Sequence, residues 1–515
     1  MKKRIMCLLL LLCMLIPTIA ACKKSGDNAE TSDSGLDTKP VEESKSKYDV
    51  YDDLGDLDFG GRTITIGRVD RSLYDDEVSV ERYSGDIVSD SIFKRNQLVE
   101  ARLNIKINDT PIDSSGYAIS NAIRNDMQSG DHNYDLTLSP VYATIMYTGE
   151  GLLSDLNKTS NINLSKPYWS QYFNESLSIG ESQYMASGAI SLSYYRYIYV
   201  TIVNDKVLES ISDAPDLVEV VNDKKWTLEY QKTLTSKYYN DANGNGKDET
   251  DGFGLLTTDY NGVDGYWSSC EISMLEKDAS NYYTLNFDAQ RMSDVVDTLM
   301  TLFSQNSTWC EPHDPSHETG VGEWDAIYSK FAEGKSLMAT MKLEGVESAA
   351  LRNMADAYTI IPIPKYYDDQ ETYYSFVQDS FTGMAIPATA PEWDRDIYAA
   401  VMEAMASESY RTVTPAYYET ALKAKYAGSA ASVDMLDMIT QNVYIDGGEM
   451  YTKKLLNISQ LFREIMATHI TNGDRFEAAG EKNVASTYNA EYLSKVKTEL
   501  DDLQTGIKKV QGLIK

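Results

Sequence analysis

The sequence predicts an α/β protein with two lobes. Strand-like and helix-like patterns alternate along the chain, its 515 residues exceed the usual size of a single core, and 42% of them are hydrophobic. A chain of this length and composition can bury two separate cores. We therefore expect an α/β body with largely parallel sheets, because helices connect successive strands.

The first 22 residues have the features of a secretory signal. Residues 2–4 are basic, an apolar run covers 5–16, and small residues at 20–21 stand directly before Cys22. The apolar run is too short to span a bilayer, which favours a signal peptide over a transmembrane helix. Small residues followed by cysteine resemble the bacterial lipobox, so we predict cleavage after residue 21 and lipid on Cys22. The alternative is an ordinary signal peptide with an incidental cysteine.

Charge limits the classes of partner. The formal net charge of −31 argues against nucleic acid and against electrostatic docking on anionic lipid as partners.

Residues 22–58 are polar, acidic and rich in serine, without periodicity, and we predict a flexible tether there. No later apolar run approaches about 18 residues, the length that would suggest a further membrane span.

Strands and helices can be placed in order along the first part of the body. Alternation at 62–66 predicts the first strand. An apolar stripe over 88–103 predicts a helix, which 105–107 follows as a second strand. A further helical stretch leads to a third strand at 134–138.

The same alternation resumes later in the chain. Residues 197–203 are typical of a strand. The stripe at 324–331 predicts a helix that ends at a glycine, followed by strands at 336–340 and 358–361. The chain ends in a helix over 493–510, which packs on the body or forms a coiled-coil seam.

Tyrosine and cysteine usage both bear on function. The chain has 37 Tyr against 11 Phe. A tyrosine ring can pack on the C–H face of a sugar while its hydroxyl bonds to the substituents, although a compositional habit explains the count equally well. After Cys22 only Cys270 and Cys310 remain, and whether they form a disulfide is open.

A calcium-type loop begins at Asp241. Oxygen-bearing side chains stand at its positions 1, 3 and 5 and glycine at position 6, as at the front of an EF-hand loop. Position 12 is glycine rather than the bidentate glutamate, and a glycine-rich turn without metal is the alternative. We predict structural Ca²⁺, with these residues as ligands: Asp241, Asn243, Asn245, Lys247 through its carbonyl, and Glu249.

Signals of catalysis are weak. The chain has no Walker A loop, no H-E-x-x-H and no G-x-S-x-G element. A glycosidase needs two carboxylates around one bond, and among 78 Asp and Glu residues no pair stands out. We therefore predict that the protein is not an enzyme.

Several segments, in their order, resemble an extracellular solute-binding lipoprotein of a carbohydrate ABC transporter, of the family-1 type found in clostridia-like bacteria. The segments are G-D-I-V-S-D-S-I-F-K-R-N-Q-L-V-E-A-R-L-N-I-K-I (85–107), G-L-L-S-D-L-N (151–157), L-S-K-P-Y-W (164–169), W-T-L-E-Y (226–230), F-A-E-G-K-S-L (331–337) and I-I-P-I-P-K-Y (360–366). The resemblance implies a periplasmic-binding-protein-like class II fold, with hinge strands and a ligand cleft between two α/β lobes.

The resemblance also implies boundaries and cleft residues. After a signal peptide at 1–21 and a tether at 22–58, the first lobe would be 59–194 plus 366–405. The second lobe would be 195–365 plus 406–515. Ligand-binding residues would be Tyr142 after a strand end, Tyr195, Arg196 and Tyr197 at the hinge, Tyr266 and Trp267 as a stacking platform, Asp379 near the return crossing, and Tyr417 and Tyr418 as another face.

The resulting hypothesis is a monomeric, membrane-anchored, extracytoplasmic lipoprotein. It would capture an oligosaccharide or other small solute for ABC permease subunits. Two alternatives stay open: a surface enzyme acting on polysaccharide, and an adhesion or scaffold lipoprotein braced by calcium.

Overall fold

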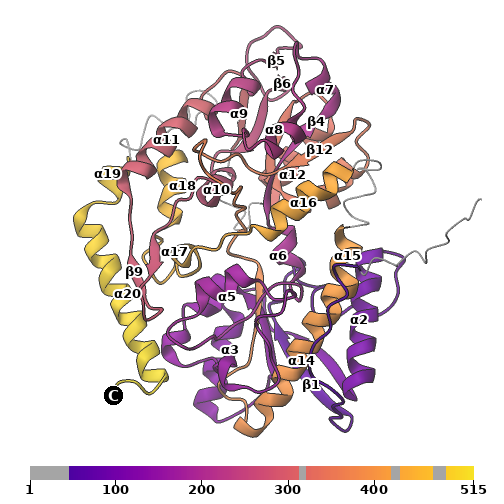
Figure 1. Ribbon diagram of the computed structural model, residues 1–515, viewed down its shortest axis with the longest axis vertical. Coiled ribbons are helices and arrows are strands. Elements are labelled where there is room, and N and C mark those ends of the chain that lie inside the picture. Colours follow the sequence, from indigo (N-terminus) through magenta and orange to yellow (C-terminus); the bar gives the residue numbers. More distant parts are fainter. Residues whose placement is uncertain (1–45, 313–320, 419–429, 468–482) are drawn as a thin grey trace, which may run out of the picture. The chain divides into compact units, whose positions relative to one another are not determined.

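Two larger sheets organise the computed structural model, which describes residues 46–312, 321–418, 430–467 and 483–515. Helices flank both sheets, so the predicted α/β fold with two lobes is confirmed (Figure 1). The predicted signal peptide and the lipid site at Cys22 lie outside the described residues. Within the described residues, no helix is long and apolar enough to cross a membrane.

The first lobe is built on a four-stranded sheet. Its strands are β1 (Arg62–Arg68), β2 (Ile105–Pro111), β3 (Leu136–Pro140) and β13 (Thr382–Ala385). The spatial order is β13-β3-β1-β2, with β1, β2 and β3 parallel and β13 antiparallel to β3. The three strands predicted in this part of the chain are therefore confirmed, and the sheet is largely parallel as expected.

Helix α2 (Ile87–Leu103) confirms the helix predicted from its apolar stripe. The Asp86 side chain caps it by accepting a hydrogen bond from the Ser89 backbone N–H at 2.9 Å. The helix ends at Asn104, which is left-handed with φ of 49°. Helix α14 (Arg395–Glu408) packs beside α2, and α3 (Ala118–Ser129) connects β2 to β3 (Figure 1).

The second lobe is built on a five-stranded sheet. Its strands are β4 (Tyr199–Asn204), β7 (Leu255–Thr258), β10 (Thr308–Glu311), β11 (Met338–Lys342) and β12 (Tyr358–Ile361). The order is β10-β7-β11-β4-β12, and β4 runs antiparallel to both of its neighbours. The other four strands run in one direction, so this sheet too is largely parallel as expected, with β4 running against them because the chain enters the lobe from the edge where the parallel strands end.

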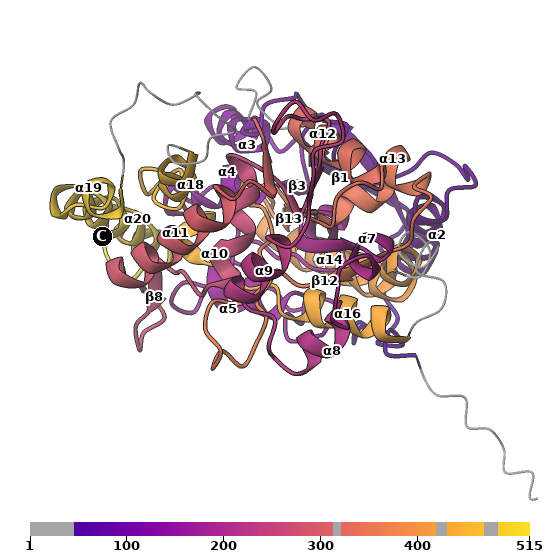
Figure 2. The ribbon, with the colours of Figure 1, turned by 90° about the horizontal axis from the view of Figure 1, so that it is seen from above.

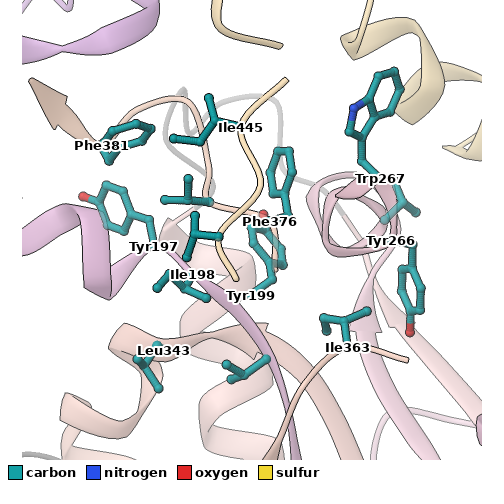
Figure 3. Packing of buried hydrophobic residues seen from close by; sticks show 14 of the residues in the cluster. Tyr197, Ile198, Tyr199, Tyr266, Trp267, Leu343, Ile363, Phe376, Phe381 and Ile445 are labelled. Atoms are coloured by element: carbon teal, nitrogen blue, oxygen red, sulfur yellow. The ribbon is translucent and has the colours of Figure 1, made fainter. Parts of the chain in front are cut away.

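Two segments cross between the lobes side by side. The first contains helix α6 (Leu192–Arg196) and leads into β4; the second is 362–381, between β12 and β13. The Tyr199 N–H donates to the Phe376 carbonyl at 2.9 Å, and the Gln378 N–H donates to the Tyr197 carbonyl at 3.2 Å. Figure 3 shows Tyr197, Ile198 and Tyr199 among the buried side chains around Phe376 and Phe381. The predicted hinge at 194–199 therefore lies against the predicted return.

The C-terminal helices pack on the body rather than forming a separate coiled coil. Helices α18 (Gln460–Ala467) and α19 (Val484–Thr487) lie close to α11 (Ala289–Phe303), as Figure 2 shows. The last helix, α20 (Ala490–Val510), packs on the short helix η1 (Thr148–Glu150), which belongs to the first half of the chain. The lobe boundaries stay a prediction, because the sheets fix only the centre of each lobe.

Specific contacts begin before the predicted end of the tether. Arg102 makes a bidentate ion pair with Asp52, both bonds being 2.6 Å, and the Asp52 N–H donates to the Ser407 hydroxyl at 3.1 Å. Lys166 pairs with Asp53 at 2.7 Å. The segment around residues 52 and 53 therefore lies on the first lobe, because its acidic side chains pair with Arg102 and Lys166 there.

Candidate functional site

The parallel strands of both lobes end at the loops that surround the crossing segments. Open α/β sheets bind ligands outside the carboxyl ends of their strands. A cavity of about 370 Å³ lies at this place, with walls from both lobes, and we call it the interlobe cavity. Its lining residues are Ser72, Leu73 and Asp76 after β1, Arg196 and Tyr197 at the first crossing, Trp324, Asp325 and Tyr328 on helix α12 (Val321–Ala332), and Lys342, Glu344, Glu347 and Ser348 at the end of β11.

Arg196 joins the two lobes at the floor of this cavity. Its guanidinium makes two bonds of 3.0 Å to Asp76 in the first lobe and lies 3.0 Å from Glu347 in the second. Burial lowers the pKa of Arg196, but the carboxylates of Glu347 and Asp76 outweigh it and hold this pKa well above its ordinary value. A planar guanidinium with five donors can bind two carboxylates through two N–H groups each, which a lysine with three donors cannot do.

An aromatic wall faces the same cavity. The rings of Trp324 and Tyr328 stack with centroids 6.3 Å apart, and the Lys342 ammonium lies 4.8 Å from the Tyr197 ring. Lys342 also pairs with Glu344 at 2.6 Å. The Tyr197 hydroxyl, the Trp324 indole N–H and the Tyr328 hydroxyl are all buried without a hydrogen-bond partner. Three unpaired polar groups at one cavity are unusual, since buried polar groups are nearly always satisfied.

A helix-capping carboxylate fixes the first crossing segment. Glu77 is fully buried and accepts hydrogen bonds from the Ser193 backbone N–H and from the Thr382 hydroxyl, the latter at 2.6 Å. Burial raises the pKa of Glu77. These bonds tie the loop after β1 to α6 and to the start of β13, so the position of Arg196 is set from three elements.

A buried carboxylate cluster lies near the return crossing. It consists of Asp264, Asp379 and Glu449 around Arg463, whose Nε is 2.5 Å from Asp264 Oδ1 and whose Nη2 is 3.9 Å from Glu449 Oε1. Burial raises the pKa of Asp264 to about 6 and that of Asp379 above its ordinary range. Burial, together with the charge of Asp379, raises the pKa of Glu449 to about 8. One guanidinium therefore faces three carboxyls.

Tyr142 and Asp379 lie close together. Tyr142 is on helix α4 (Val141–Ile145), directly after β3, and its backbone N–H points at the Asp379 carbonyl at 3.4 Å. The Tyr142 ring contacts Tyr117 edge to face, with centroids 6.0 Å apart. Burial, and next the charge of Asp379, raise the pKa of Tyr142 to about 12.

The predicted stacking platform at Tyr266 and Trp267 is corrected by the structure. Tyr266 is fully buried, and its hydroxyl bonds to Gln231 at 3.0 Å and lies 3.2 Å from the Thr340 hydroxyl. Trp267 is buried edge-on against Phe462, with centroids 5.5 Å apart. Figure 3 shows both on the short helix α10 (Gly265–Ser269). A ring packed on both faces by core side chains cannot offer a face to a sugar.

Two cysteines in the second lobe are thiols and do not bond to each other. Cys270 and Cys310 are both buried. Burial raises the pKa of Cys270 to about 12 and also raises that of Cys310. Thiols with pKa values this high carry little thiolate at neutral pH, so neither is set up as a nucleophile.

Two predicted site residues, Tyr195 and Tyr418, line a second pocket instead of the interlobe cavity. Tyr195 meets Tyr418 edge to face at 5.4 Å, and Tyr417 is buried beneath, stacked on Tyr195 at 6.4 Å. This pocket of about 340 Å³ is here called the tyrosine pocket. Its aromatic lining is Tyr48, Tyr168, Trp169, Tyr172, Tyr194, Tyr195, Tyr410 and Tyr418, and its polar lining includes Lys47, Thr414, Asp437, Thr440 and Gln441.

A larger depression lies elsewhere, on the surface of the second lobe. It has a volume of about 730 Å³ and is lined by side chains such as Lys224, Lys225 and Asp223. Lys225 already pairs with Asp223 at 2.8 Å, and both are largely exposed. Paired, solvated charges give a ligand little to bind, so we do not place the site there.

The predicted calcium loop forms a tight turn held by its own side chains. Asp241 accepts from the backbone N–H groups of Gly244 at 2.6 Å and Gly246 at 3.0 Å. The Asn243 and Asn245 amides donate to Asp248 at 3.1 and 2.7 Å. Among the described residues, no three His, Cys, Asp or Glu side chains converge as a metal site. Asp251, however, keeps one buried carboxylate oxygen without a partner beside this turn.

Sequence reasoning missed most of the interlobe cavity. It identified Arg196 and Tyr197 but not Asp76, Glu347, Trp324 or Tyr328. The rule that ligands lie at the carboxyl ends of parallel strands could have identified the loop after β1 and the end of β11. The order of the strands, which that rule needs, is a property of the folded chain.

Comparisons with known proteins find weak similarity to solved structures and no match at the level of sequence. No family model matches the chain, and no curated protein does. An extracellular solute-binding protein family 1 from Alicyclobacillus acidocaldarius is 13% identical over 86% of this chain and 99% of its own, with a TM-score of 0.48.

Two further solved structures are similar to the same degree. An ABC transporter solute-binding protein from Thermotoga lettingae, bound with α-D-tagatose, is 12% identical over 87% of this chain and 100% of its own, with a TM-score of 0.49. An ABC substrate-binding protein from Listeria monocytogenes in complex with cycloalternan is 12% identical over 88% of this chain and 99% of its own, with a TM-score of 0.48. At these values the assignment of a site rests on the residues of this chain.

Proposed function

We propose that the protein is the sugar-binding component of an ABC transporter and holds its solute in the interlobe cavity. The observation that supports this most is a cavity of about 370 Å³ walled by residues of both lobes, among them the aromatic side chains of Tyr197, Trp324 and Tyr328.

The chemistry of the cavity suits a sugar. Aromatic rings offer flat apolar faces to the C–H side of a pyranose, and their hydroxyl and indole groups can bond to its substituents. The carboxylates of Glu344 and Asp325 can accept hydrogen bonds from sugar hydroxyls. Since the walls belong to both lobes, a ligand that contacts both would stabilise the closed arrangement.

We propose an extracytoplasmic location and a lipid anchor on Cys22. The basic, apolar and small residues that precede Cys22 support both. In this arrangement the membrane holds the protein near permease subunits of the transporter, which would be its partners. The protein would act as a monomer and would not cleave its ligand.

Calcium in the Asp241 loop is a separate proposal. The loop offers hard oxygen atoms from Asp241, Asn243 and Asn245, and the unpaired Asp251 oxygen next to it is a further acceptor. Bound Ca²⁺ would brace the turn and take no part in sugar binding. Titration with Tb³⁺ and competition by Ca²⁺ should give luminescence that Asp241→Ala removes; no luminescence in the unchanged protein would contradict the proposal.

The proposed function is tested by binding and turnover in the same samples. We expect at least one oligosaccharide in a thermal-shift screen to raise the Tm, because binding to the folded state alone stabilises it. Calorimetry should then show about tenfold weaker binding for Asp325→Ala, which removes an exposed acceptor at the cavity, or about 1.4 kcal/mol.

The matched control is Asp297→Ala, an exposed aspartate on α11 away from the cavity, which should bind as the unchanged protein does. Equal affinities of Asp325→Ala and Asp297→Ala for the glycan would mean that the ligand does not bind in the interlobe cavity. Release of reducing ends from the bound glycan would replace the transport function by the enzyme alternative. If no glycan in the screen raised the Tm, a sugar would be rejected as the ligand.

A further inference from the structure

The lining of the interlobe cavity contains more carboxylates than cations. Its acidic side chains are Asp76, Asp325, Glu344 and Glu347, and its basic ones are Arg196 and Lys342. The other lining residues are uncharged. With four carboxylates against two cations, two negative charges have no positive counterpart in the lining, however the groups pair.

Pairing within the cavity occupies both cations. Arg196 is shared by two carboxylates, at 3.0 Å from Asp76 and 3.0 Å from Glu347, and Lys342 pairs with Glu344 at 2.6 Å. Each carboxylate is also more exposed than the cation that it binds. The exposed side-chain fractions are 29% for Asp76 and 19% for Glu347 against 15% for Arg196, and 21% for Glu344 against 7% for Lys342. A ligand that enters the cavity therefore meets the carboxylates before the cations.

Asp325 is the carboxylate that no cation of the lining neutralises. It is exposed, and among the described residues its side chain has no hydrogen bond or ion pair. It follows Trp324 directly on α12 and lies one turn before Tyr328. A carboxylate in this position can bind a cation that comes from outside the protein.

The cavity already holds one ammonium group in such surroundings. The Lys342 ammonium lies 4.8 Å from the centroid of the Tyr197 ring and 5.4 Å from that of the Trp324 ring, and it pairs with Glu344. The face of an aromatic ring attracts a cation through its quadrupole. Rings and carboxylates thus act in the same direction here, in favour of positive charge.

We infer that the sugar selected by the interlobe cavity carries an amino group, so that amino sugars are the ligand class rather than neutral or acidic sugars. This inference rests on the proposed function and narrows its substrate class. The ligand ammonium pairs with Asp325 and is attracted by the exposed carboxylates of Glu344 and Glu347. A uronic acid would bring a further negative charge to a cavity whose two cations are both paired, which like-charge repulsion and desolvation oppose.

The test is calorimetry with four trisaccharides that differ in charge: the glucosamine trimer, its N-acetylated form, maltotriose and trigalacturonate. At about pH 6 the amines of the first are protonated. We expect the glucosamine trimer to bind about tenfold more tightly than either neutral trisaccharide, since hydrogen bonds to charged groups are the stronger ones. Trigalacturonate should bind most weakly. Asp325→Asn keeps an acceptor oxygen but removes the charge, so it should weaken the glucosamine trimer about tenfold and the neutral trisaccharides less.

The matched control is Asp297→Asn, at the exposed aspartate on α11 that does not line the cavity. If the two Asn variants bound the glucosamine trimer equally, the inference would be wrong, because the trimer would then bind through the net charge of −31 alone. A neutral or acidic trisaccharide that binds as tightly as the glucosamine trimer would also overturn it. If Asp325→Ala weakened the binding of that trisaccharide, the proposed function would still stand. Absence of binding for all four would reject amino sugars, while the wider glycan screen would decide on the proposed function.

Discussion

The two pockets on either side of α6 differ in what holds their walls together. At the interlobe cavity, charge does so: Arg196 is bound to Asp76 in one lobe and to Glu347 in the other. At the tyrosine pocket, ring packing does so, and the single ion pair at its mouth, between Lys47 and Asp437, is well exposed. The same short helix therefore presents a charged face to one pocket and an aromatic face to the other.

Because of this difference, we expect the two sites to respond differently to substitution and to pH. A buried charge cannot be removed without leaving its partners uncompensated, so the stability of the two lobes at the interlobe cavity should be sensitive to substitution of Arg196. Tyrosine hydroxyls do not ionise near neutrality, and burial raises the pKa of Tyr195 and Tyr418 further. The walls of the tyrosine pocket should therefore be insensitive to pH near neutrality.

The largest expected effect comes from Arg196→Met, which leaves two carboxylates facing each other at the crossing. We expect the free energy of unfolding to fall by about 3–5 kcal/mol in urea titrations. The control is Arg124→Met, because Arg124 and Glu150 form a partly exposed pair of 2.9 Å whose loss should cost no more than about 1 kcal/mol. Equal losses for the two variants would mean that Arg196 is an ordinary surface charge.

A smaller effect is expected from pH, through the carboxylate cluster. Burial raises the pKa of Asp264 to about 6 and, with the charge of Asp379, that of Glu449 to about 8. A carboxyl whose pKa rises on folding binds its proton more tightly when folded, so its contribution to stability is present at low pH. That contribution is lost as the pH rises from the unfolded pKa through the folded one.

The free energy of unfolding should therefore fall between about pH 5 and about pH 8, by at most about 1.4 kcal/mol per pH unit for each proton. Glu449→Gln should flatten this slope, because the amide cannot ionise. Asp297→Ala, at an exposed position, should leave it unchanged. A rise in stability over the same range, or an equal slope in Glu449→Gln, would contradict the assignment of the effect to this cluster.

The smallest effect is expected at the mouth of the tyrosine pocket. Lys47→Met breaks a pair whose side chains are 44% and 32% exposed, so the free energy of unfolding should change by less than about 1 kcal/mol. Added salt should remove even that difference, since exposed pairs are screened. A loss comparable to that of Arg196→Met would show that charge, not ring packing, holds this pocket as well.

The hydrophobic pattern along the chain determined where the helices and strands of this protein lie. The apolar stripes of α2 and α20 and the alternation of β1 could be recognised from the sequence, because side-chain periodicity follows directly from backbone geometry. The hinge near residue 196 was also predicted, from a resemblance in the order of motifs, whereas its contact with the return segment was not. Tyr197 and Arg196 entered the predicted site by the same route.

Only the tertiary structure decided which side chains share a cavity. Trp324 and Tyr328 belong to the apolar stripe of α12, and a stripe does not tell a core ring from one at a cavity wall. Tyr266 has the same composition signal as Tyr197, yet it packs in the core because the end of β7 places α10 under the sheet. Asp76 and Glu347 are 271 positions apart in the sequence, and strand order alone brings them to Arg196. Contacts of that range depend on how the sheets assemble, which no local pattern encodes.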